Sequence, residues 1–188
     1  LRDARPHLRS NLHMQSTRYY MYRQILNDIG AHYSKVLLTD VADVYFQSDP
    51  FEGLPEAEVI FTEEPLRIGH SRTNLNWLNE IAGQDVVSAL SESPIICGGT
   101  TFGTVVGISH YVDRMIRLLA NPRNQIPTSG IDQAFHIMVA LLDPPTSSVI
   151  VPNSAPVATM NYMRPNDIAI KDNALHDTAM GRIPALVH

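Results

Sequence analysis

Apolar side chains recur at helical spacing near the start of the chain. The positions i, i+3, i+4 and i+7 of one helix face are occupied by Tyr22, Ile25, Leu26 and Ile29. This spacing predicts an amphipathic helix over residues 16–29, in which Ser16 or Thr17 caps the first turn and Gly30 stops the last one. Residues 1–15 are polar and show no clear period.

Three further segments have helical spacing. A helix over residues 74–83 is predicted by Leu75, Leu78 and Ile81. A longer apolar face predicts a helix that ends at Asn121 and Pro122, and its members are Ile108, Tyr111, Val112, Met115, Leu118 and Leu119. The last helix is predicted over residues 132–142, because two prolines follow Asp143 and cannot continue it.

Short apolar runs between these helices predict strands. They are residues 36–39, residues 57–62 with an end at Glu63-Glu64-Pro65, residues 95–97 with a break at Gly98-Gly99, residues 149–151 and residues 183–187. Helices and strands thus alternate along the chain, without an internal repeat or low-complexity linker. The pattern predicts an α/β fold in which helices pack against a sheet.

Length and composition narrow the class of protein. The 188 residues suit one domain over residues 1–188. No apolar run approaches the roughly 18 residues of a membrane span, so we expect no transmembrane segment. The net charge of −5 and the scattered lysines and arginines argue against nucleic-acid binding and favour a cation as the charged partner.

The single cysteine, Cys97, excludes an internal disulfide and fits a reducing compartment. We therefore expect a cytoplasmic location and leave open a peripheral association with a membrane. Because residue 1 is Leu and no signal-peptide pattern follows, we also expect that the chain begins inside a longer gene product.

Two carboxylates follow the strand predicted over residues 36–39. Asp40 and Asp43 stand where that strand reaches the edge of the sheet, which is where open α/β sheets bind ligands. Two carboxylates three residues apart can converge on Mg²⁺ or Mn²⁺, which then neutralises a diphosphate. The alternative is structural, because Asp is also common in turns and at helix caps.

Four segments resemble, in the same order, the nucleotide-sugar glycosyltransferases of the GT-A fold. They are "YSKVLLTDVADVYFQSDPF", "SPIICGGTTFGT", "GIDQAFHIMVALL" and "GRIPALVH". The resemblance covers roughly residues 16–188 and implies a mixed sheet flanked by helices. It departs from the family in two ways: the acids are Asp40-Val41-Ala42-Asp43 in place of Asp-X-Asp, and part of the N-terminal nucleotide-binding unit is not visible before residue 16.

The resemblance assigns roles to individual residues. It implies metal ligands at Asp40, Asp43 and His188, and a catalytic carboxylate at Asp132, which contacts the hydroxyls of the reacting sugars and is a candidate general base for the acceptor. The donor-binding residues that it implies are Arg23, Asp40, Gly98, Gly99 and Gln133.

Several of these residues could instead have a purely structural role. Asp132 is suited to cap the last helix, the two glycines to form a tight turn, and Arg23 to be a solvated helix residue. Arg18, in the first turn of its helix, is the weaker arginine candidate, and Glu63 and Glu64 are reserve candidates for the acid.

The expected function is transfer of a sugar from a nucleoside-diphosphate donor to a glycan or other hydroxyl acceptor, with Mn²⁺ or Mg²⁺. The sequence leaves open whether the anomeric configuration is retained or inverted. Two alternatives remain. One is a non-catalytic sugar-binding module derived from a glycosyltransferase. The other is a metal-dependent phosphohydrolase, although that chemistry usually needs its two acids closer together than Asp40 and Asp43 are.

Overall fold

The computed structural model describes residues 12–154, 156–161 and 163–188. Most of the polar start of the chain, residues 1–11, lies outside the described residues. The α-helices are α1 (Met14–Ile29), α2 (Arg72–Ala82), α3 (Gln84–Leu90), α4 (Val105–Ala120) and α5 (Ile131–Leu142). None of the helices in these ranges combines the length and the apolar character needed to cross a membrane.

The strands form three small sheets. Their bounds are β1 (Lys35–Thr39), β2 (Tyr45–Phe46), β3 (Val59–Arg67), β4 (Pro94–Thr104), β5 (Ser148–Val151), β6 (Val157–Ala158), β7 (Ile168–Lys171), β8 (Ala174–Asp177) and β9 (Leu186–Val187). The largest sheet has the order β1-β4-β3-β5, the second has the order β2-β9-β6, and β7 and β8 form a hairpin. In the largest sheet β4 runs antiparallel to β1 and β3, and β5 runs parallel to β3. The sheet is therefore mixed, and β1, β3 and β5 end at the same edge.

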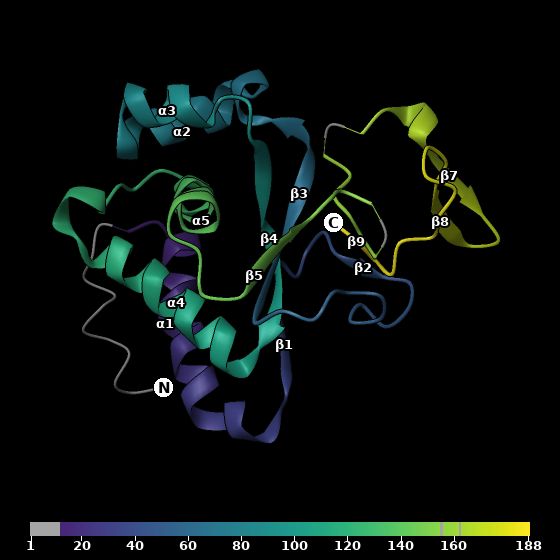
Figure 1. Cartoon of the computed structure of the whole chain (residues 1–188), viewed down its shortest axis with the longest axis horizontal. Coiled ribbons are helices and arrows are strands. Elements are labelled where there is room, and N and C mark those ends of the chain that lie inside the picture. The colour runs from purple at the N-terminus through teal and green to yellow at the C-terminus, as the bar shows by residue number, and fades with distance from the viewer. Residues whose placement is uncertain (1–11, 155, 162) are drawn as a thin grey trace.

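The main sheet has a different partner on each face. Helices α1, α4 and α5 lie on one side, and the small sheet of β2, β9 and β6 lies on the other (Figure 1). Along β3, Val59 and Phe61 belong to the core under the helices, and Ile60 between them belongs to the second core. This alternation follows from the two-residue period of a strand. The predicted α/β class is confirmed, with a mixed sheet and helices packed against it.

The four helices predicted from spacing are present as α1, α2, α4 and α5. The predicted cap of α1 was wrong. His13 caps the helix by accepting a hydrogen bond from the backbone of Gln15, and Ser16 is buried inside the first turn. Gly30 does end α1, but with helical φ and ψ that lead into a 3-10 turn rather than the left-handed conformation of a glycine stop. A methyl group at Gly30 would lie 3.0 Å from Val105 Cγ1, so the glycine lets α1 approach the start of α4.

Two predicted strand ends were also wrong. Strand β3 continues through Glu63 and Pro65 to Arg67, with shifts in register against β4 on either side of Glu63. Such irregularities let a strand accommodate proline, which lacks the N–H of a regular ladder. Strand β4 continues through Gly98 and Gly99. Of the last predicted strand, residues 183–187, only β9 pairs as a strand.

A histidine is buried in the core under the helices. His136 on α5 is fully buried, its Nδ1 lies 2.6 Å from the hydroxyl oxygen of Tyr111, and its ring packs edge-on against Phe61. Burial, helped by the positive charge of Arg18, lowers the pKa of His136 to about 3. The folded protein therefore holds this imidazole neutral where the unfolded chain, with an ordinary pKa of 6.5, binds a proton.

We expect this difference to destabilise the protein in mild acid. Between pH values near 3 and near 6.5 the unfolded state binds more protons, so the free energy of unfolding rises with pH across this window. The His136 contribution should be smaller at about pH 5 than at about pH 7.5 by about 2 kcal/mol. Urea unfolding at both pH values tests this. The His136→Phe variant should lose that part of the pH dependence, whereas His110→Gln, at an exposed position on α4, should keep it. Equal pH dependence in all three proteins would contradict the assignment.

Candidate metal centre

Three residues that are far apart in sequence meet at the edge where β1 ends. Asp40 follows β1 directly, and its N–H donates to the carbonyl of Gly99 on β4 at 3.1 Å. Asp43 lies on the turn that follows. His188 follows β9, and its N–H donates to the carbonyl of Ala158 at 2.9 Å. These two backbone hydrogen bonds hold Asp40 and His188 at the ends of β1 and β9, where His188 lies beside the two acids.

The side chains of Asp40, Asp43 and His188 form what we call the Asp-Asp-His cluster. One ligand atom from each lies within 4.8 Å of the others. His188 Nε2 is 3.5 Å from Asp40 Oδ2 and 3.9 Å from Asp43 Oδ1. Asp43 is the exposed member, with 71% of its side chain accessible, whereas His188 has 14% accessible. The cluster therefore has a buried side and a side that opens to solvent.

The donor set fits a divalent cation. Carboxylate oxygens suit Mg²⁺ and Mn²⁺, and a neutral imidazole nitrogen suits Mn²⁺. Three protein ligands would leave further positions of such an ion for ligand oxygens. The three residues predicted as metal ligands are thus brought together, and metal binding by them stays a prediction.

Gly99 makes room for the cluster. A methyl group at this position would overlap the imidazole ring of His188 and lie 2.8 Å from Asp40 Oδ2. Gly98, its neighbour, faces the opposite way: a methyl group there would lie 3.4 Å from Gln133 Oε1, a tight but tolerable contact. The two glycines are therefore not a turn. They are flat positions in β4, where side chains approach the strand closely.

Cys97 contacts the His188 ring at the nitrogen that faces away from the two carboxylates. Its Sγ lies 3.2 Å from Nδ1, so Nε2 is the nitrogen that faces the two carboxylates. The contact with Asp40, and after it the contact with Cys97, raises the pKa of His188 to about 10. The same contact with His188 lowers the pKa of Asp40 against the effect of burial. A cation binding here would thus replace a proton on Nε2. From the sequence, Cys97 is only a small core residue.

Arg18, the weaker arginine candidate, lies beside the cluster. Its Nη1 is 2.6 Å from Asp40 Oδ1, and its Nη2 is 2.8 Å from Asp132 Oδ2 and donates to the carbonyl of Gly98 at 3.2 Å. The guanidinium thus links β1, β4 and α5. A signal for this position existed in the sequence, because Arg18 stands one turn before Tyr22 on the inner face of α1.

Arg23, the stronger arginine candidate, lies elsewhere. It faces α4, where it donates to the carbonyl of Ser109 at 2.7 Å and pairs with Asp113. The structure therefore does not bring Arg23 to the Asp-Asp-His cluster. The reason is geometric: five residues along a helix rotate a side chain well away from Arg18.

Asp132 and Gln133 stand at the start of α5, on the inner side of β4. The residue that caps α5 is Gly130 and not Asp132. The side chain of Asp132 is 4% accessible and forms an ion pair with Arg18. Burial raises the pKa of Asp132, and the charge of Arg18 opposes this shift. In this arrangement Asp132 positions Arg18, and the catalytic role implied by the resemblance stays a prediction.

Gln133 connects the cluster region to a second buried carboxylate. Its Nε2 donates to Glu64 Oε1 at 3.0 Å and to Asn74 Oδ1 at 3.2 Å. Glu64 is buried and its pKa is raised by that burial, whereas Glu63 points to the other face of β3 and is more accessible. Of the two reserve candidates for the catalytic carboxylate, Glu64 is therefore the one that lies beside Gln133.

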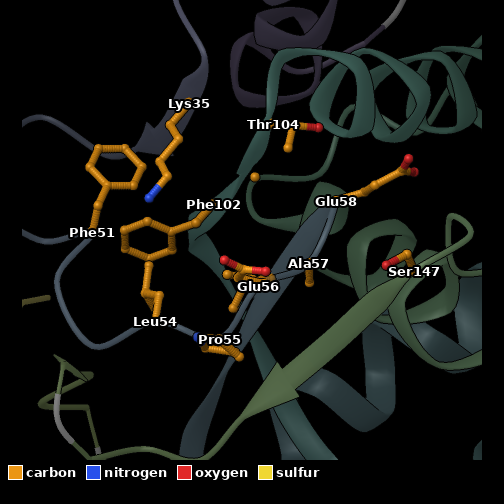
Figure 2. A pocket seen from close by; sticks show the side chains of 12 residues that line it. Lys35, Phe51, Leu54, Pro55, Glu56, Ala57, Glu58, Phe102, Thr104 and Ser147 are labelled. Atoms are coloured by element: carbon orange, nitrogen blue, oxygen red, sulfur yellow. The ribbon is translucent and has the colours of Figure 1, made fainter.

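One cavity that the described residues line is not at the cluster. It has a volume of about 510 Å³ and lies at the start of β1, beside Lys35, Phe51 and Phe102 (Figure 2). The Asp-Asp-His cluster stands at the other end of that strand. The cavity and the cluster are separate features.

Two comparisons of the sequence with known proteins find no match. No model of a known protein family matches the chain. A search of curated proteins also finds no match. Functional assignment therefore depends on the geometry of the site and on the resemblance of its segments to glycosyltransferases.

Proposed function

We propose that the protein is a metal-dependent glycosyltransferase of the GT-A type. It would move a sugar from a nucleoside-diphosphate donor to a glycan or other hydroxyl acceptor, and nucleic acid would not be a partner. The same proposal includes a cytoplasmic location and leaves open a peripheral association with a membrane. The observation that carries it is the convergence of Asp40, Asp43 and His188 from two distant segments.

The proposed role of the cluster is to hold Mn²⁺ or Mg²⁺. Asp40 and His188 are the fixed ligands in this proposal. Arg18 orients Asp40 through their ion pair, and Cys97 orients His188 through its contact with Nδ1. Asp43 is the accessible ligand on the side where a donor would enter. When bound, the cation neutralises the diphosphate that leaves during glycosyl transfer.

The surroundings of the cluster support a role for the glycines and for α5. Because Gly98 and Gly99 have no side chains, Gln133 lies directly against one of them and Asp40 and His188 lie directly against the other, which holds these three proposed site residues close together. Gln133 lies against Gly98, and its amide oxygen can accept from hydroxyl groups, because its nitrogen already donates to Glu64 and Asn74. Arg18 replaces Arg23 in this proposal, because it is the arginine beside Asp40.

Calorimetric titration of UDP and GDP, with and without Mn²⁺, tests the proposal. We expect the native chain to bind at least one of the two nucleotides only when Mn²⁺ is present. The Asp43→Ala variant should bind that nucleotide roughly tenfold more weakly or worse, because it lacks the accessible ligand. Asp28→Ala, which removes an exposed carboxylate from α1, is the matched control and should bind like the native chain.

Two results would contradict the proposal. One is nucleotide binding by the native chain that is the same with Mn²⁺ and with a chelator. The other is Mn²⁺-dependent binding that survives intact in Asp43→Ala, since the cation would then lie elsewhere.

A further inference from the structure

The cavity at the start of β1 is a site that the metal chemistry does not use. Lys35 begins β1 and Asp40 follows its end, so five residue steps, roughly 16 Å of extended chain, separate the two places. The cavity volume of about 510 Å³ lies within the range of small-molecule sites, about 300–1,000 Å³. It is therefore large enough to hold a small ligand of its own.

One wall of the cavity is apolar. The rings of Phe51 and Phe102 meet edge to face, with centroids 5.7 Å apart, and Leu54 extends this wall. Phe102 is fully buried in the second core, so it supports Phe51, whose ring is only half-buried. Figure 2 shows the two rings and Leu54 side by side on the same wall. Such a wall can contact the C–H face of a ligand ring.

Charged groups of both signs line the same cavity. The Lys35 ammonium lies 5.8 Å from the centroid of the Phe51 ring, and no ion pair joins it to another of the described residues. Glu56 lines the cavity as well, whereas the side chain of Glu58 extends away from the two rings (Figure 2). The part next to the rings thus has one positive and one negative group.

This combination excludes most ligand classes. Glu56 repels a phosphate or a carboxylate, and Lys35 repels a compact cation. A wholly apolar molecule would take both charges out of water without giving them a partner. A neutral ligand rich in hydroxyl groups meets all three demands, because hydroxyls donate to a carboxylate and accept from an ammonium while the ring packs on an aromatic wall.

We propose that this cavity binds a neutral sugar ring. Phe51 supplies the packing surface, Lys35 donates to ring hydroxyls and Glu56 accepts from them. The site is separate from the Asp-Asp-His cluster and needs no metal. It goes beyond the proposed glycosyl transfer and would exist even if the cluster bound no nucleotide.

Titration of glucose, galactose and mannose into ¹⁵N-labelled protein, in EDTA, tests the inference by NMR. At least one sugar should cause saturable shifts of the amides around Gly103 and Thr104, which line the cavity. Phe51→Ala should weaken that binding about tenfold. Phe46→Ala, an exposed aromatic residue on β2 outside the cavity, is the matched control and should bind like the native chain.

Glu56→Gln tests the polar half of the site. Its position is exposed, so the variant should fold even if Phe51→Ala does not. It should weaken sugar binding several-fold, and Asp43→Ala should leave it unchanged. Failure of all three sugars to saturate, loss of binding in EDTA, or equal binding by the Glu56→Gln and native proteins would overturn the inference. The nucleotide titrations, which use Mn²⁺ and UDP or GDP without sugar, judge the glycosyltransferase proposal separately.

Discussion

Replacing Arg18 with methionine should lower the free energy of unfolding by about 3–5 kcal/mol. The change leaves the Asp132 carboxylate, with 4% of its side chain accessible, as a buried charge without its partner. It also removes the hydrogen bonds that tie α1 to Asp40 and to the carbonyl of Gly98. Chemical denaturation of the native and variant proteins at neutral pH measures the loss.

Arg23→Met is the matched control for this experiment. The same side chain is removed from the same helix, but its partner Asp113 has 52% of its side chain accessible. Water can solvate Asp113 once the pair is broken, so we expect a loss of about 1 kcal/mol or less. The double variant Arg18→Met/Asp132→Asn should recover part of the first loss, because no buried charge remains. Equal losses in Arg18→Met and Arg23→Met would show that the buried network does not contribute as we infer.

Replacing Gly99 with alanine should weaken Mn²⁺ binding by about 10–100-fold. The added methyl group would overlap the His188 ring and approach Asp40 Oδ2, so two of the three side chains of the Asp-Asp-His cluster must move. Because alanine is less depleted from strands than glycine, the variant should still fold. Calorimetric titration of Mn²⁺ into the native and variant proteins measures the change.

Gly98→Ala provides the comparison. It adds the same methyl group one residue earlier, where it meets Gln133 Oε1 at 3.4 Å and no member of the Asp-Asp-His cluster. We expect its Mn²⁺ affinity to stay close to that of the native protein. If the two alanine variants bind Mn²⁺ equally well, the close fit of Gly99 against His188 has no role in the site.

Local patterns in the sequence predict the helices well and the strand ends poorly. Helix α4 has six apolar residues on one face and a proline two residues after its end, and such signals act within a few turns. Strand β4 contains Gly98 and Gly99, which locally favour a break, yet it continues because β1 and β3 pair with it on both sides. Strand β2 is two residues long and owes its existence to β9, which lies far along the chain.

Some residues of the candidate site could likewise be predicted from the sequence, and others could not. Asp40 and Asp43 could be predicted because they follow an apolar strand, and His188 because its segment resembles that of a known family. The resemblance favoured Arg23, whereas the spacing of Arg18 from Tyr22 favoured Arg18. The choice between them depends on which side of α1 faces β1 and which faces α4.

The sequence by itself determined the α/β class, the positions of the main helices and the residues able to bind a divalent cation. These follow from side-chain chemistry and from periods of two and 3.6 residues, which act over short distances. Only the tertiary structure decided that His188 meets Asp40 and Asp43, that Gly99 makes room for them and that Arg18 stands behind them. Those contacts depend on strand pairing and helix packing between segments up to 148 residues apart, from Asp40 to His188, and no local pattern encodes such pairings.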